Sequence, residues 1–110
     1  MSIVVNLYYT GKDGSAIRFA KEMEDRGIAA RIRAEEGNEK YEYYTSFADP
    51  ETVLLIDSWK DQESLDRHHA SAMMKEIAEL REQYDLHMRV ERFTSDENGV
   101  PDKDQAFIRK

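Results

Sequence analysis

The sequence predicts a single domain of the α+β class, built on a four-stranded antiparallel sheet with its helices on one face. Three observations lead to this prediction. The chain has 110 residues, enough for one hydrophobic core and too few for two. Its apolar stretches and helical segments follow the order β-α-β-β-α-β. The stretches at 3–10 and 53–59 are apolar on both sides, so the sheet needs cover on both faces.

The first half of the chain supplies one strand and two helical pieces. The strand is expected at residues 3–10, and its alternation puts four apolar side chains on one face: Ile3, Val5, Leu7 and Tyr9. A helix at 16–26 follows, burying Ile17, Ala20 and Met23. Gly27 separates it from a second helical piece at 28–35, which Gly37 ends.

The second half supplies three strands and the longest helix. Strands are expected at 40–47, 53–59 and 86–93, and the nearly all-apolar middle one should be central. One helix is expected from residue 61 to 84, with this inward stripe: Leu65, Ala72, Met73, Ile77, Leu80 and Tyr84. Residues 1–94 then form the domain. Residues 95–110 form a polar C-terminal extension whose apolar segment 106–108 is expected to dock at a dimer interface.

Two helices on one face leave the other face of the sheet uncovered. That face would carry apolar side chains from several strands, and a large exposed apolar face indicates an interaction surface. We therefore expect a homodimer in which two sheets pack face to face. The two copies would enclose a water-poor chamber that holds the functional site.

Composition excludes several classes of function. The net charge of −7 argues against nucleic acid, because phosphate binding needs clustered Lys and Arg. No apolar run approaches the roughly 20 residues of a membrane span, and the N-terminus does not resemble a signal peptide. The absence of cysteine removes disulfides, thiol nucleophiles and thiolate metal ligands. We expect a cytoplasmic protein.

The segment from Ser58 to Met74 carries the most chemical information. The central strand ends on Trp59, an acidic turn starts a helix, and Leu65 and His68 follow three residues apart. Residues three apart are neighbours on a helix surface. The pattern predicts a small apolar cavity with an aromatic wall and one imidazole as a proton acceptor.

The chain resembles the antibiotic biosynthesis monooxygenase (ABM) domains, which include small quinol monooxygenases. The resemblance rests on two collinear motifs, of which the first is Trp59, Lys60-Asp61, Leu65, His68 and Ser71. The second comprises Arg33, Glu35, Gly37, Tyr41 and Glu42. The match extends over residues 3 to 93. Met73 stands where the family often has a second His, and His69 where an apolar residue is more usual.

The resemblance implies a dimeric ferredoxin-like α+β barrel that oxygenates a small electron-rich aromatic with dioxygen, using neither metal nor flavin. A hydroquinone anion can pass an electron to dioxygen by itself, so the protein must remove a phenolic proton, stabilise the oxyanion and exclude water. The expected catalytic residues are His68 and Asn6. The expected substrate-binding residues are Trp59, Tyr43, His69 and Asp57.

Each candidate also has an ordinary structural explanation. A histidine on a helix flank is usually solvated, and His69 would pack beside Met73 with its polar edge bonded to Glu76. Asn6 could sit at an exposed strand position, and Trp59 could serve only as core. Metal binding is not expected, because adjacent histidines point about 100° apart on a helix.

Three other functions remain open. Some ABM relatives degrade haem, and they resemble each other in having a Trp and, ten residues later, a His on the long helix. This chain has His68 in place of that Trp and Ala78 in place of that His. An isomerase acting on small oxygenated metabolites is the second. The third is a non-enzymatic dimer that only binds a small ligand.

Overall fold

The structure is a computed structural model that describes residues 1–110. Four strands and five helices follow one another along the chain. They are β1 (Ile3–Thr10), α1 (Ser15–Asp25), α2 (Ile28–Arg33), β2 (Asn38–Thr45), β3 (Thr52–Trp59), α3 (Gln62–His69), α4 (Met73–Gln83), β4 (His87–Thr94) and α5 (Asp102–Gln105). None of these helices combines the length and the apolar character that a membrane span requires.

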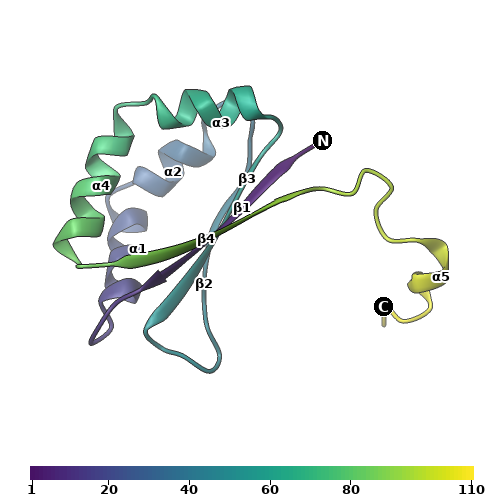
Figure 1. Cartoon of the computed structure of the whole chain (residues 1–110), viewed down its shortest axis with the longest axis horizontal. Coiled ribbons are helices and arrows are strands. Elements are labelled where there is room, and N and C mark those ends of the chain that lie inside the picture. Colours follow the sequence, from purple (N-terminus) through teal and green to yellow (C-terminus); the bar gives the residue numbers. More distant parts are fainter.

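The strands form one antiparallel sheet in the order β2-β3-β1-β4, with α1 to α4 on one side of it (Figure 1). This confirms the predicted α+β, ferredoxin-like fold. The apolar strand β3 lies between β2 and β1, as expected for a central strand. Its register with β1 pairs Leu55 with Leu7 and Trp59 with Ile3.

The core lies between the sheet and the helices. Alternate residues of β1 point into it, so Ile3, Leu7 and Tyr9 are buried and Val5 packs against them, as the pattern predicted. The larger buried side chains that the helices contribute are Phe19, Met23, Ile28, Ile32, Leu65, Ile77 and Leu80.

The single helix predicted from 61 to 84 is wrong. The chain forms two helices, α3 and α4, separated by Ala70, Ser71 and Ala72. At about 100° per residue, Leu65 and Ile77 would lie roughly 120° apart around one straight helix. Both are buried, so a break that reorients the helix lets each half face the sheet. Ala72, expected in the inward stripe, is exposed.

The second face of the sheet carries no helix. Cross-strand neighbours there include Val4 beside Phe93, Asn6 beside Ile56, and Tyr8 beside Leu54. Phe93 is 51% exposed, and Arg89 lies over the Tyr8 ring at 4.0 Å from its centroid. We call this surface the open face.

The C-terminal extension leaves the body after β4. Ser95 and Ser2 exchange two hydrogen bonds, the amide of Ser95 donating to the Ser2 carbonyl and the amide of Ser2 donating to Ser95 Oγ. Beyond this point the chain runs outward as an arm that ends in α5 (Figure 1). The radius of gyration is 15.6 Å, whereas about 13 Å is usual for a compact chain of this length.

Candidate functional site

A cavity of about 310 Å³ lies between the sheet and helices α3 and α4. Apolar side chains from both layers form most of its wall: Val5, Leu7, Leu55, Leu65, Met74, Ile77, Met88 and Val90. Polar groups converge from β2, β3, α3, α4 and β4: Tyr41, Asp57, His68, His69, Arg81 and Arg92. A mostly apolar wall with a few convergent polar groups is typical of a site for a small organic ligand.

This position differs from the one expected. The sequence led us to place the site in a chamber between two packed sheets. The structure instead forms the His68 cavity on the helix-covered face, within one chain. The physical reason is the phase of the strands, because Val5, Leu7, Leu55 and Asp57 all point toward the helices.

His68 is the most constrained ionisable group of the cavity. It is buried on α3, and its Nδ1 lies 3.0 Å from Oε1 of Glu35. A carboxylate only accepts hydrogen bonds, so Nδ1–H is the donor and Nε2 of the neutral ring is left as an acceptor. The imidazole also stacks on the Trp59 indole, with ring centroids 4.8 Å apart and planes at 27°. Its orientation is therefore fixed from two sides.

A hydrogen bond joins Asp57, at the wall of the cavity, to Trp59. Nε1–H of Trp59 donates to Oδ1 of Asp57 at 2.6 Å. Trp59 is fully buried behind His68, whereas Asp57 borders the cavity. Burial raises the pKa of the Asp57 carboxyl to about 6, although the hydrogen bond from Trp59 and the electrostatic interaction with His68 both lower it.

Tyr41 and Arg81 line the cavity beside Asp57. The Tyr41 hydroxyl is 3.3 Å from that of Tyr43, and burial raises the pKa of the Tyr41 phenol. Tyr41 therefore keeps its proton at neutral pH and offers a hydroxyl group. Nη2 of Arg81 donates to the Tyr9 hydroxyl at 2.8 Å.

His69 lies at the rim rather than in the core. It is exposed, its ring centroid is 5.7 Å from that of His68, and partial burial lowers its pKa. The expected bond to Glu76 is absent, because Glu76 accepts hydrogen bonds from Arg26 and Arg31. His69 is the last residue of α3, and its side chain is exposed there.

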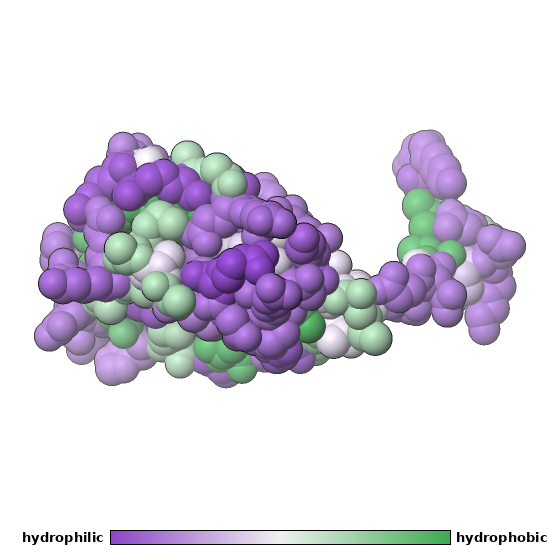
Figure 2. All heavy atoms as spheres, turned by 90° about the horizontal axis from the view of Figure 1, so that it is seen from above, coloured by the Kyte–Doolittle hydropathy of each residue, from purple (hydrophilic) through white to green (hydrophobic).

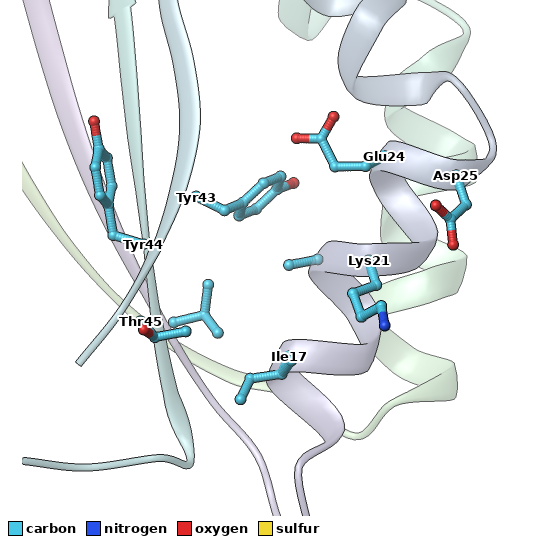
Figure 3. A pocket seen from close by; sticks show the side chains of 9 residues that line it. Ile17, Lys21, Glu24, Asp25, Tyr43, Tyr44 and Thr45 are labelled. Carbon is cyan, nitrogen blue, oxygen red and sulfur yellow. The ribbon is translucent and has the colours of Figure 1, made fainter. Parts of the chain in front are cut away.

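Two predicted site residues lie elsewhere. Asn6 is on the open face, with the sheet between it and His68, and its Oδ1 is buried without a hydrogen-bond partner. Tyr43 points from β2 toward α1 and borders a second, more open hollow of about 320 Å³ (Figure 3). Tyr44 points away from α1 in the same view. Tyr43 thus supports Tyr41 from behind instead of lining the His68 cavity.

The structure therefore brings His68, His69 and Asp57 together around one cavity, with Trp59 packed behind His68. Sequence reasoning missed Glu35, Arg81 and Tyr41 as members of this group. Glu35 and Tyr41 are both part of the second motif, and that membership could have indicated a role at the site. The sequence also indicated Arg81, because it follows the buried Ile77 by four residues on α4 and so lies on the same side of that helix.

No group of three or more His, Cys, Asp or Glu side chains is arranged to hold a metal ion. The arrangement can accept a proton at His68 Nε2, donate from the Tyr41 hydroxyl and keep an aromatic ring among apolar walls. These capacities suit proton abstraction from a small phenolic compound.

Comparison with known families decides the classification. The sequence profile of the family described as "Antibiotic biosynthesis monooxygenase" matches residues 2–80. The chain belongs to the ABM family. The match covers both motifs and includes His68, Glu35, Asp57 and Trp59. A comparison with curated proteins finds no match.

Solved structures share the ABM fold. A Deinococcus radiodurans protein provisionally assigned as an antibiotic biosynthesis monooxygenase is 14% identical, with a TM-score of 0.75 over 86% of this chain and 93% of that one. A conserved protein from Methanosarcina mazei Go1 is 25% identical, with a TM-score of 0.75 over 87% and 94%. SnoaB, a cofactor-independent oxygenase from Streptomyces nogalater, is 14% identical, with a TM-score of 0.73 over 87% and 94%.

Proposed function

We propose that this ABM protein is a cofactor-independent monooxygenase that oxidises a small electron-rich aromatic such as a hydroquinone. The observation that carries the proposal is the fixed imidazole of His68, bonded to Glu35 at 3.0 Å and stacked on Trp59 beside an apolar cavity. Membership of the ABM family and the fold shared with the oxygenase SnoaB support it.

In the proposed reaction, Nε2 of His68 removes a proton from a phenolic hydroxyl. The Tyr41 hydroxyl donates a hydrogen bond to the oxyanion. The electron-rich anion passes one electron to dioxygen, and the resulting radical pair forms a carbon–oxygen bond at the ring. The hydroperoxide then loses water to give a hydroxyquinone. One oxygen atom enters the product and the other leaves as water, so the substrate supplies all the electrons.

The test is oxygen uptake with menadiol by the wild type and by His68→Ala. We expect a loss of about 10²–10⁴-fold in kcat, the usual contribution of a general base. His87→Ala is the matched control, because His87 is exposed on β4 and does not line the cavity. Circular dichroism must show that both variants fold. Wild-type uptake no faster than menadiol autoxidation would overturn the proposal and favour a binding protein.

The proposal includes a homodimer formed through the open face. Apolar side chains gather there, among them Val4, Ile56 and the half-exposed Phe93, and Oδ1 of Asn6 has no partner within the chain. A second copy packed on this face would cover these side chains and could satisfy the amide.

The C-terminal extension, residues 95–110, completes the proposed dimer. Its apolar side chains touch little of their own body, and Phe107 is 88% exposed. Figure 2 shows them gathered on an arm that stands clear of the domain. We expect this arm to lie against the second copy.

A further inference from the structure

The wall of the cavity carries more arginines than carboxylates, unlike the protein as a whole. The chain has a net charge of −7, yet the cavity is lined by two arginines, Arg81 and Arg92, and by a single carboxylate, Asp57. Glu35 bonds to His68 from outside this lining. The arginines at the wall can attract an anion locally, because low-dielectric walls strengthen the field inside.

Arg81 lacks the partner that other arginines of the chain possess. Arg26, Arg31, Arg33 and Arg67 each form an ion pair with a glutamate, whereas Arg81 forms none. Of the five donors of its guanidinium, Nη2 bonds to Tyr9, while Nε is buried without a partner. The guanidinium as a whole therefore has more donors than acceptors around it, and Arg81 borders the cavity.

Aromatic neighbours hold Arg81 in place, and no carboxylate lies within ion-pair distance of it. Its guanidinium carbon lies 5.4 Å from the centroid of the Tyr9 ring. Tyr9 is fully buried and packs on Phe19, with their ring centroids 5.1 Å apart. Burial raises the pKa of the Tyr9 phenol, while Arg81 lowers it. The charge of Arg81 therefore stays available to the cavity.

Arg92 provides a second positive charge at the mouth. It lies on the same face of β4 as Met88 and Val90, it is exposed, and its Nη2 donates to Oε1 of Gln62 at the start of α3. It also forms no ion pair. An exposed arginine in this place raises the local concentration of anions near the entrance.

We propose that the substrate of this site is an aromatic acid, whose carboxylate pairs with the guanidinium of Arg81 while its phenolic hydroxyl meets His68. This inference rests on the proposed function and names its substrate class. Arginine is suited to the role because its planar fork binds carboxylates through two parallel hydrogen bonds. A cavity of about 310 Å³ is at the small end of ligand sites, as a single substituted ring requires.

The test compares 2,5-dihydroxybenzoate with its neutral amide, 2,5-dihydroxybenzamide, in anaerobic calorimetric titrations. The two probes share the hydroquinone ring and differ in charge. The wild type should bind the acid at least about tenfold more tightly than the amide, as a charge-assisted pair predicts. Arg81→Met should remove this preference and Arg81→Lys should retain part of it.

Arg92→Met and Arg89→Met complete the set. Arg92 is exposed, so its variant should fold normally and lose a smaller share of the preference for the acid. Arg89 lies on the opposite face of the same strand, over Tyr8, and its variant should bind both probes as the wild type does. Equal affinity of the wild type for acid and amide would overturn the inference. Equal losses for both probes in Arg81→Met would do so as well, because they would indicate a purely structural arginine.

An aerobic arm separates this inference from the proposed function. Selective binding of the acid without oxygen uptake would support the anionic ligand and overturn the monooxygenase. Oxygen uptake with equal KM for the two probes, unchanged in Arg81→Met, would support the monooxygenase and overturn the anionic substrate. A fall in kcat with both probes, at unchanged KM, would assign Arg81 to the phenolate instead and overturn the carboxylate contact.

Discussion

The imidazole of His68 stacks on the indole of Trp59, with ring centroids 4.8 Å apart, and Glu35 and Asp57 bond to the two rings from different sides. Two carboxylates thus hold two aromatic rings in one fixed pair. Glu35 reaches the cavity-lining His68, while Asp57 reaches the fully buried Trp59. Asp57 therefore orients the indole, whereas Glu35 orients the imidazole.

Glu35→Gln should slow the proposed reaction by about tenfold without unfolding the protein. The amide can still bond to Nδ1 but no longer supplies a negative charge to the imidazolium that forms during proton transfer. Oxygen uptake with menadiol measures the effect. Glu36→Gln is the matched control, because Glu36 is exposed and its carboxylate faces Lys60. Identical kcat in Glu35→Gln and wild type would contradict a positioning role.

Asp57 should make stability depend on pH. Burial raises its pKa to about 6 in the folded state, above about 3.9 in an unfolded chain. The folded state therefore holds the proton more tightly, so this contribution is fully present below pH 4 and is lost as pH rises through 6. Relative to Asp57→Asn, the wild type should lose about 2 kcal/mol of unfolding free energy between pH 4 and 7.

Urea denaturation at several pH values gives this comparison. Asp66→Asn serves as its control, because Asp66 is exposed on α3 and bonds only to Gln62. Its curve should run parallel to that of the wild type. If the Asp57→Asn curve also runs parallel, the raised pKa is wrong.

Phe93→Ser should weaken the proposed dimer, whereas Val90→Ser should not. Both side chains are on β4 and both are 51% exposed, but Phe93 lies on the open face and Val90 borders the cavity. The substitutions thus remove apolar side chains of equal fractional exposure from opposite faces of one strand. Sedimentation equilibrium over a range of concentrations should show a raised dissociation constant for Phe93→Ser alone. A monomeric wild type would exclude the homodimer.

Removal of residues 95–110 should shift the same equilibrium toward monomer while leaving the thermal midpoint of the dissociated domain close to that of the full chain. The arm buries none of its own residues, so its loss removes little intramolecular contact. A milder variant, Phe107→Ser, should reproduce part of the effect. Unchanged association in both variants would show that the arm does not dock on the second copy.

The alternation of apolar residues in β1 and the apolar run of β3 were enough to predict the sheet and its central strand. The break between α3 and α4 was missed, although Leu65 and Ile77, both assigned to one inward stripe, lie about 120° apart around a straight helix and so already indicated it. The same limit applied to Tyr41 and Tyr43. They share one face of β2, and only the packing of the helices determines which of them borders the cavity.

Trp59 is the only tryptophan of the chain, and it touches both His68 and Asp57. Indole emission responds to the polarity and protonation of contacting groups, so the intrinsic fluorescence of this protein comes from a single reporter behind the cavity wall. Occupancy of the cavity can therefore be followed optically in the unmodified chain, without a dye and without waiting for turnover.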